Sequence, residues 1–326
     1  MISHYALRLV CICLASFFLV NAAACLLTAL ASRVAIRIAE SMRPRSAARF
    51  LFALRVFPSA LGAAAVLGLC VPSYLWLEPQ AASERIGVAC MLLAILGAIC
   101  WSSSLVRVSR ALGASARLYR AWQLSGCETL LPGETANAVV VSNDAPLLTL
   151  VGVFYPRLVV SQSVLCSLSA EQLHLALQHE NSHRSSRDNL KRLFLLLAPA
   201  PVPFFRGFSS FERHWARLSE WAADDEAVQG DSRRALSLAD ALLRLARLGE
   251  PPRLTFLHTA FLAADHDLSA RVDRLLTVDP LPARTFSSAR ALAIGSGLAM
   301  SACVAVLLAL PATLPPVHRL LELFLR

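Results

Sequence analysis

The sequence predicts a mainly α-helical membrane protein with four transmembrane helices and one α+β domain between the third and the fourth. Apolar residues make up 56% of the 326 residues and charged residues only 16%. Soluble domains usually carry roughly 25% charged residues, so part of this chain must lie in lipid. Four uncharged apolar runs reach the roughly 20 residues that cross a bilayer. They are residues 9–31, 56–77, 86–106 and Ala291–Thr313, the last within a segment 288–314.

Arginines cluster in two of the segments that connect these runs. The first cluster contains a single acidic residue and comprises Arg33, Arg37, Glu40, Arg43, Arg45 and Arg49. Four more arginines follow the third run, and loops rich in arginine stay in the cytoplasm. We therefore expect residues 107–287 to form a cytoplasmic domain, and both chain ends, including the tail 315–326, to be extracytoplasmic. The net charge of +9 is a topology signal on this interpretation, and we expect no direct nucleic-acid partner, because no stretch combines basic clusters with stacking aromatic residues.

Most of the nine cysteines lie inside the apolar runs. There we expect them to behave as small hydrophobic residues and to remain free thiols. These cysteines are Cys11, Cys13, Cys25, Cys70, Cys90, Cys100 and Cys303.

A fifth apolar stretch, Leu193–Phe205, is too short to span a bilayer and contains three prolines, so it is not an ordinary transmembrane helix. Basic residues bracket it, which favours a re-entrant or interfacial hairpin under anionic headgroups. A buried hairpin in the core of the domain fits the sequence equally well. The sequence leaves this choice open.

A helix with two histidines one turn apart is predicted inside the domain. Ser169-Ala-Glu-Gln172 is a capping box, so we expect the helix to begin there and to run towards Leu190. His179 and His183 stand at i and i+4 on one face, and Glu180 lies beside them. In this His-Glu-x-x-His arrangement two neutral imidazoles bind zinc and the carboxylate reaches the metal-bound water.

A second predicted helix supplies carboxylates at the same spacing. It covers Phe211–Val228, stops near Gly230 and contains Glu220-Trp-Ala-Ala-Asp224. Glu220 can complete the protein ligands of one zinc ion per chain, and Asp224 can hold a ligand histidine by its second ring nitrogen. An exposed acidic face is the alternative for both carboxylates. Two independent helices with ligand-compatible spacing favour the metal site.

Two short strands, Val139–Ser142 and Leu158–Ser161, are predicted before the histidine helix. Either one offers a sheet edge to which an extended substrate can be added. Ordinary packing inside a sheet is the alternative for each strand.

These motifs resemble the gluzincin metallopeptidases of membranes. His-Glu-Asn-Ser-His183 is followed by Arg187-Asp188-Asn189-Leu190 and then by the Glu220 motif, and Gly152–Ser161 is similar to the strand segment before the active-site helix of that family. Three spans before the domain and one after it are similar to the bacterial antirepressor peptidases, best known as beta-lactam sensor-transducers. The resemblance implies a zincin-type metalloprotease domain in a multi-pass protein of the bacterial inner membrane. It also implies a site in which zinc is held by His179, His183 and Glu220, with Glu180 as general base and Asp224 behind a ligand.

The chain departs from that family in two respects. Asn181, Ser182 and Arg184 are more polar than the usual choices around the second histidine, and Arg326 follows the fourth span closely, so we expect no extracellular penicillin-binding sensor. Membrane quality-control and prenyl-protein peptidases share the zinc motifs, and Arg271 is similar to an arginine near the end of their protease domain. Arg271 or His266 is our candidate for the second donor to the oxyanion, beside the metal.

The expected function is zinc-dependent hydrolysis of peptide bonds in a protein substrate on the cytoplasmic side, in regulatory signalling. The expected partners are the lipid bilayer and a protein substrate such as a cytoplasmic transcriptional repressor. Membrane quality control and an inactive signal-transducing scaffold remain alternatives. Cleavage within the bilayer ranks last, because charged residues follow the histidines, and the sequence leaves the oligomeric state open.

Overall fold

The computed structural model describes residues 2–77, 87–131, 138–142, 145–201, 208–249, 259–260, 268–277, 315–316 and 319. The helices are α1 (Ile2–Leu30), α2 (Ser32–Glu40), α3 (Pro44–Ala65), the π-helix η1 (Val66–Cys70), α4 (Val71–Leu77), α5 (Val88–Ser125), α6 (Gln162–Ser167), α7 (Ala170–Ser186), α8 (Asp188–Leu197), α9 (Ser209–Val228), α10 (Ser232–Arg247) and α11 (Leu268–Leu276). The strands are β1 (Gly126–Thr129), β2 (Ala138–Val141), β3 (Leu148–Val151), β4 (Arg157–Ser161) and β5 (Thr259–Ala260). The two predicted strands are therefore confirmed.

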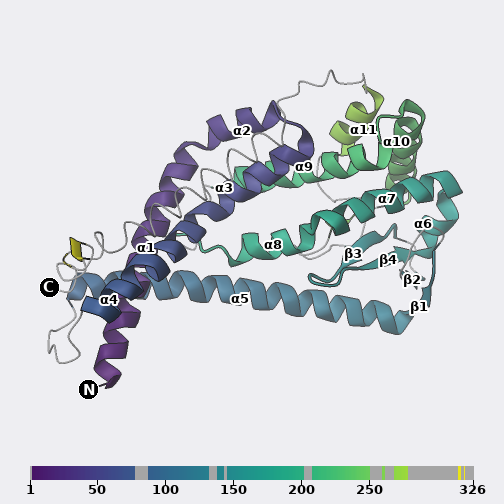
Figure 1. Cartoon of the computed structure of the whole chain (residues 1–326). Helices are drawn as coiled ribbons and strands as arrows, with labels where there is room; N and C mark the ends of the chain where they lie inside the picture. The colour runs from purple at the N-terminus through teal and green to yellow at the C-terminus, as the bar shows by residue number, and fades with distance from the viewer. Residues whose placement is uncertain are drawn as a thin grey trace.

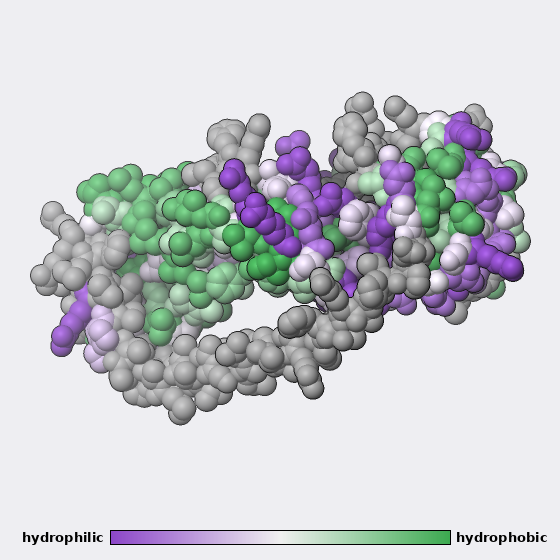
Figure 2. Space-filling model, turned by 90° about the horizontal axis from the view of Figure 1, so that it is seen from above, coloured by the Kyte–Doolittle hydropathy of each residue, from purple (hydrophilic) through white to green (hydrophobic). Residues whose placement is uncertain are grey.

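Three helical segments of the described chain are long and apolar enough to cross a membrane. They are Tyr5–Leu30, Pro44–Leu77 and Val88–Ser125, and they match the first three predicted spans. The predicted fourth span lies outside the described residues. Apolar surface gathers over the half of the molecule that these helices form, and hydrophilic surface gathers over the half that holds the sheet (Figure 2).

The third span and the domain share one helix. Helix α5 continues without interruption from residue 107 to Ser125, which adds about 28 Å at 1.5 Å per residue. Its last turns pack Leu118, Tyr119 and Trp122 against one face of the sheet. The expected domain boundary at residue 107 thus falls inside one continuous helix that belongs to both the span and the domain (Figure 1).

The sheet has the strand order β1-β2-β4-β3-β5, in which β2 and β4 are parallel and the other neighbours are antiparallel. Side chains alternate between its faces. Leu158 and Val160 of β4 face the core shared with α7, α10 and α11, whereas Val159 faces α5. Both predicted strands, β2 and β4, have a neighbour on each side within this sheet. Neither offers a free edge to a substrate, so the packing interpretation holds for both.

The described part of the Leu193–Phe205 stretch packs against the candidate spans. Asn21 of α1 donates from Nδ2 to the carbonyl oxygen of Pro199 at 3.3 Å, and the thiol of Cys100 on α5 donates to the carbonyl oxygen of Pro201 at 3.2 Å. Leu195 belongs to a cluster formed with α1, α2, α3 and α9. Residues 193–201 therefore lie beside the apolar helices and not in the core of the sheet domain.

Candidate metal centre

Helix α7 presents both histidines to α9. The predicted capping box is confirmed: Ser169 Oγ accepts from the backbone N–H of Gln172 at 3.2 Å, and Gln172 Oε1 accepts from the backbone N–H of Ser169 at 3.0 Å. This start fixes the register of the helix, so His179 and His183 share the face that packs against α9. Both imidazoles are buried.

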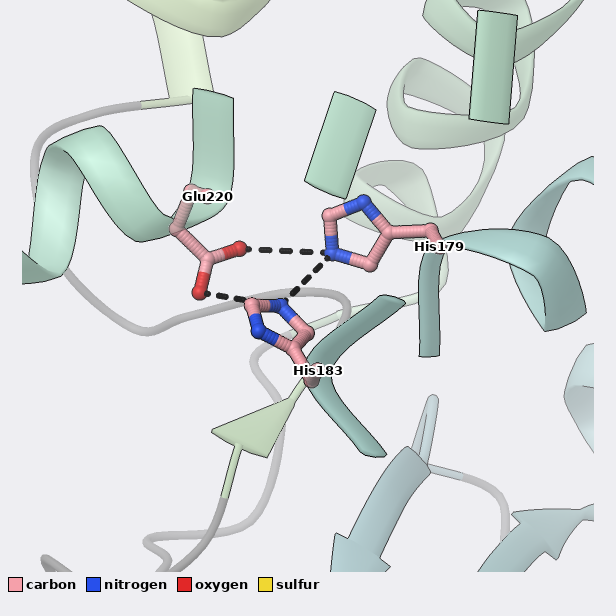
Figure 3. Close-up of side chains that lie close together, drawn as sticks. All are labelled: His179, His183 and Glu220. Atoms are coloured by element: carbon pink, nitrogen blue, oxygen red, sulfur yellow. Dashed lines mark hydrogen bonds and ion pairs between the residues drawn. The ribbon is translucent and has the colours of Figure 1, made fainter. Parts of the chain in front are cut away.

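The structure brings His179, His183 and Glu220 together, although Glu220 comes from a different helix (Figure 3). The two Nε2 atoms lie 3.2 Å apart. Glu220 Oε2 lies 3.5 Å from His179 Nε2, and Glu220 Oε1 lies 3.5 Å from His183 Nε2. In a tetrahedral zinc site with bonds of about 2.05 Å, neighbouring ligand atoms stand about 3.3 Å apart. The two nitrogens have this spacing, each faces one oxygen of the carboxylate, and one ligand atom from each residue lies within 4.8 Å of the others, so the group can close around a zinc ion.

The other ring nitrogen of each histidine faces a carboxylate. His179 Nδ1 lies 2.9 Å from Asp224 Oδ1, and His183 Nδ1 lies 2.8 Å from Asp188 Oδ2. A carboxylate at Nδ1 keeps the proton on that nitrogen, which leaves the Nε2 lone pair for a metal. Both imidazoles are thus oriented with Nδ1 towards a carboxylate and Nε2 towards the shared centre, as a metal site needs.

One sequence expectation about this region is wrong. The helix that begins at Ala170 does not run to Leu190, because Arg187 adopts a left-handed conformation with φ 54° and a new helix, α8, begins at Asp188. In a continuous helix Asp188 would stand about 140° around the axis from His183. The break turns the chain so that the Asp188 carboxylate meets the imidazole instead.

Asp188 is the centre of a small buried network that the sequence did not reveal. Its Oδ1 accepts from Lys191 Nζ at 2.7 Å, and its Oδ2 accepts from Ser219 Oγ at 2.8 Å in addition to the contact with His183. Burial opposes ionisation of Asp188, but His183 and Lys191 outweigh it and hold the pKa of this carboxyl below its usual range. In the sequence Asp188 stands only as part of the motif Arg187-Asp188-Asn189-Leu190, which does not show where its side chain lies.

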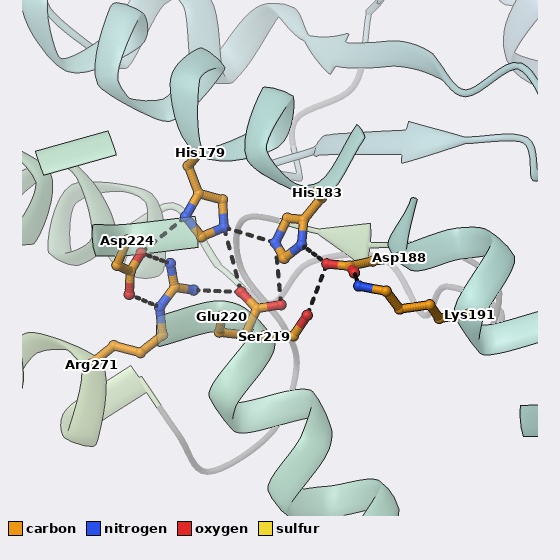
Figure 4. A network of polar contacts seen from close by, with 8 residues as sticks. All are labelled: His179, His183, Asp188, Lys191, Ser219, Glu220, Asp224 and Arg271. Atoms are coloured by element: carbon orange, nitrogen blue, oxygen red, sulfur yellow. Dashed lines mark hydrogen bonds and ion pairs between the residues drawn. The ribbon is translucent and has the colours of Figure 1, made fainter. Parts of the chain in front are cut away.

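Arg271 holds two carboxylates of α9 at once (Figure 4). Its Nε donates to Asp224 Oδ2 at 2.9 Å, its Nη2 donates to Asp224 Oδ1 at 2.7 Å, and its Nη1 lies 3.2 Å from Glu220 Oε2. Burial raises the pKa of Asp224, but the Arg271 guanidinium outweighs it and lowers that pKa to about 2. Because all three nitrogens face carboxylates, the geometry favours a positioning role for Arg271 over the expected role of oxyanion donor. His266, the other candidate donor, lies outside the described residues.

Glu180 stands apart from this network. Its side chain is buried, and neither carboxylate oxygen has a hydrogen-bond partner among the described residues. Burial is the main cause that raises the pKa of Glu180 to about 7, although the neighbouring His183 and His179 oppose the shift. A carboxylate that exchanges its proton near neutral pH is suited to acid–base catalysis.

The BlaR1 peptidase M56 family matches residues 82–275, which is more than half of the chain. The chain belongs to this family. Membership makes it a membrane metallopeptidase by family, in agreement with the three apolar helices. The match to the M56 family includes α5, the sheet and every residue of the candidate metal centre. No curated protein and no solved structure matches the chain.

In this M56 peptidase, His179, His183 and Glu220 form a buried group that could bind a metal ion. The group depends on two helices, α7 and α9, that pack against each other. A third helix, α11, supplies Arg271, which links the Glu220 and Asp224 carboxylates. The centre is therefore assembled from elements that are distant in sequence.

Proposed function

We propose that this M56 peptidase is a zinc-dependent endopeptidase that hydrolyses peptide bonds of a protein substrate at the cytoplasmic face of the membrane. The observation that carries the proposal is the buried group of two imidazole nitrogens 3.2 Å apart, each 3.5 Å from one oxygen of the Glu220 carboxylate, beside the buried carboxylate of Glu180. His179, His183 and Glu220 would hold one zinc ion per chain. Two histidines and a glutamate leave a fourth position open, as catalytic zinc sites do.

The roles of the remaining residues follow from their contacts. Zinc in this site would supply a Lewis acid that activates water and polarises the scissile carbonyl. Glu180, whose buried carboxylate has no hydrogen-bond partner among the described residues, accepts the proton of the attacking water and passes it to the departing amine. Asp188 and Asp224 hold the two imidazoles, and Arg271 holds Glu220 and Asp224.

Glu180→Gln is the variant that tests this mechanism, with Glu171→Gln as its control. Both residues lie on α7, but Glu171 is exposed in the first turn. We expect the Glu180→Gln protein to bind one zinc ion per chain and to produce no new protein termini in cells. The Glu171→Gln protein should retain both properties. Undiminished proteolysis in Glu180→Gln would reject the mechanism, and wild-type protein purified without stoichiometric zinc would favour an inactive scaffold.

We also propose that the site works close to the membrane surface. Helix α8 starts at Asp188 beside the metal centre and covers about 15 Å in its ten residues. Directly after it, Pro199 and Pro201 contact the candidate spans α1 and α5. This path supports a peptidase that cleaves protein segments near the bilayer.

For the topology we propose the bacterial inner membrane, with residues 107–287 in the cytoplasm, a fourth span within 288–314 and an extracytoplasmic tail 315–326. The positive-inside distribution of arginine supports this orientation. Reporter fusions after residues 50, 82 and 120 test it. The first and third should report the cytoplasm and the second the opposite side. An extracytoplasmic signal from the third fusion would overturn the orientation.

We propose a cytoplasmic transcriptional repressor as the substrate, because the motifs resemble antirepressor peptidases, and membrane quality control is the alternative. Mapping the cellular protein termini that depend on Glu180 separates the two. New termini inside a DNA-binding regulator would support the signalling role. Termini confined to misfolded membrane proteins would support quality control.

A further inference from the structure

A group of thiols occupies the end of the helical bundle that lies away from the metal centre. Cys11 and Cys13 come from α1, Cys70 is the last residue of η1, and Cys90 lies in the first turn of α5. All four belong to one packed cluster, and all are free thiols. In Figure 1 this end of the bundle lies beside the N-terminus and α4, opposite the sheet.

Two of these thiols are in direct contact. The side chains of Cys13 and Cys70 are hydrogen-bonded to each other, although they are 57 positions apart in the sequence and belong to different helices. Other buried thiols of the bundle have oxygen partners: Cys25 donates to Asn21 Oδ1 and Cys100 donates to the carbonyl oxygen of Pro201. Cys70 is also hydrogen-bonded to the side chain of Ser16, so the Cys13–Cys70 pair differs from these other thiols in the contact between its two sulfur atoms.

The local backbone and a pair of tyrosines hold these two thiols in place. Cys70 ends a π-helical turn that interrupts the line from α3 to α4, and such turns frequently occur at functional sites. One turn further on, Tyr74 OH donates to the carbonyl oxygen of Tyr5 at 3.3 Å, and Tyr5 OH donates to that of Tyr74 at 3.5 Å. Their rings lie 4.8 Å apart. These reciprocal contacts fix α1 against α4, so the sulfur atoms need little further ordering to meet.

A buried arginine marks the same end of the bundle. Arg8 lies one turn before Cys11 on α1 and is only 5% exposed. Ionisable side chains are costly inside apolar bundles and occur mainly where the bundle has a function. This observation is independent of the thiols and points to the same region.

We propose that Cys13 and Cys70 form an oxidisable pair, in which a peroxide generates a disulfide that ties α1 to the η1–α4 helix. One sulfur attacks a peroxide oxygen, the O–O bond breaks, and a sulfenic acid and one water form. The second sulfur then attacks the first, an S–S bond forms, and the sulfenic oxygen leaves as a second water with the remaining thiol proton. The two thiols lose two electrons in total, and hydrogen peroxide gains them. This site lies outside the metal centre and does not depend on the peptidase function.

The position of the pair gives the bond a structural consequence. The helix that ends in η1 is α3, and its Arg55 contacts Glu212 of α9 at 2.9 Å. Helix α9 carries Glu220 two turns later. A disulfide at Cys70 would thus restrain the continuous segment α3–η1–α4, and α3 is the part of it that contacts α9 from the membrane side. In the topology proposed above, the pair faces the extracytoplasmic half of the bilayer, the side on which disulfides persist.

Peroxide treatment of the full-length protein followed by tryptic mass spectrometry tests the pair. The sequence separates the cysteines well: Cys70 is the only cysteine in the tryptic peptide 56–85, whereas Cys11, Cys13 and Cys25 share peptide 9–33, and Cys90 and Cys100 share peptide 86–107. After exposure to hydrogen peroxide and alkylation of the remaining thiols, we expect peptides 56–85 and 9–33 to be linked through Cys13. Dithiothreitol should release them and restore two alkylatable thiols.

Cysteine variants provide the controls. In Cys13→Ser and in Cys70→Ser, hydrogen peroxide should no longer remove two alkylatable thiols. Cys25→Ser removes a buried thiol with an oxygen partner, and it should behave as the wild type does. The link in unsubstituted protein is itself decisive, so the test stands even if a serine variant folds poorly. Cys70 that stays alkylatable after peroxide, or that links to peptide 86–107 or to Cys11 instead, would overturn the proposal.

Discussion

At the scale of single residues, the candidate metal centre depends on carboxylates that do not touch the metal position. Each ligand histidine turns one nitrogen towards Glu220 and the other towards an aspartate, Asp224 for His179 and Asp188 for His183. Such partners fix the tautomer and the ring orientation, and their loss commonly weakens metal affinity 10- to 100-fold. The ligands alone therefore do not define the site.

Asp188→Asn is expected to weaken zinc binding by about 10- to 100-fold, because the amide no longer forces the proton onto His183 Nδ1. Competition with a chromophoric chelator measures this affinity. Asp225→Asn is the control, since Asp225 is an exposed neighbour on α9 that pairs with Arg274. Equal zinc affinity in both variants would show that Asp188 has no part in holding the ligand.

Arg271→Met is expected to destabilise the protein by about 3 to 5 kcal/mol, because it leaves the buried Asp224 and Glu220 carboxylates without their cation. Arg274→Met, one turn along the same helix, removes a partly exposed pair with Asp225 and should cost less than about 1 kcal/mol. The free energy of unfolding in detergent gives both values. If the two variants lost similar amounts of unfolding free energy, Arg271 would not be the residue that stabilises the two buried carboxylates.

At the scale of elements, the contact of α3 with α9 links the membrane part to the metal centre. Arg55 of α3 is buried, pairs with Glu212 of α9 at 2.9 Å, donates to the carbonyl oxygen of Leu195 on α8 and stacks over Phe208 at 4.5 Å. Helix α8 in turn starts with Asp188. One arginine in a candidate span thus contacts both helices that flank the site.

Arg55→Met is expected to cost about 2 kcal/mol of stability, because it removes a charged hydrogen bond from a mostly buried pair. The loss is smaller than that for Arg271, since Glu212 is 32% exposed and regains water. Arg45→Met is the matched control: Arg45 also lies on α3 and pairs with Glu226 of α9, but both side chains are about half exposed, so it should cost under about 1 kcal/mol. Thermal unfolding of the three proteins in detergent compares them, and an Arg45 variant as unstable as the Arg55 variant would refute this ranking.

At the scale of the whole molecule, the metal centre joins helices that belong to distant parts of the chain. The donor atoms come from α7 and α9, Arg271 comes from α11, and α3 contacts α9 from the membrane side. An ion that binds only the folded arrangement stabilises all of these contacts together. Metal binding and global stability should therefore be linked.

Removal of metal with a chelator is expected to lower the unfolding midpoint of the full chain, and added zinc should restore it. At a free zinc concentration 100 times its dissociation constant, the linkage contributes about 2.7 kcal/mol. His179→Ala should show no response to either treatment. If neither the chelator nor added zinc changed the unfolding midpoint of the wild-type protein, this would argue against a resident zinc ion.

The sequence by itself determined the features that depend on near neighbours. Apolar length gave three spans, the capping box fixed the start of α7, and i and i+4 spacing placed His179 and His183 on one face, because helix geometry repeats within a few residues. The prediction of one continuous helix towards Leu190 failed, because an arginine such as Arg187 does not indicate a left-handed backbone conformation.

Only the tertiary structure decided the contacts between distant segments. The 47 positions that separate Asp224 from Arg271, and the 178 that separate Asn21 from Pro199, are bridged by the packing of whole helices. Local periodicity shows which face of a helix is apolar but not which helix covers it. The metal centre, its supporting carboxylates and the Cys13–Cys70 contact all depend on which helix packs against which.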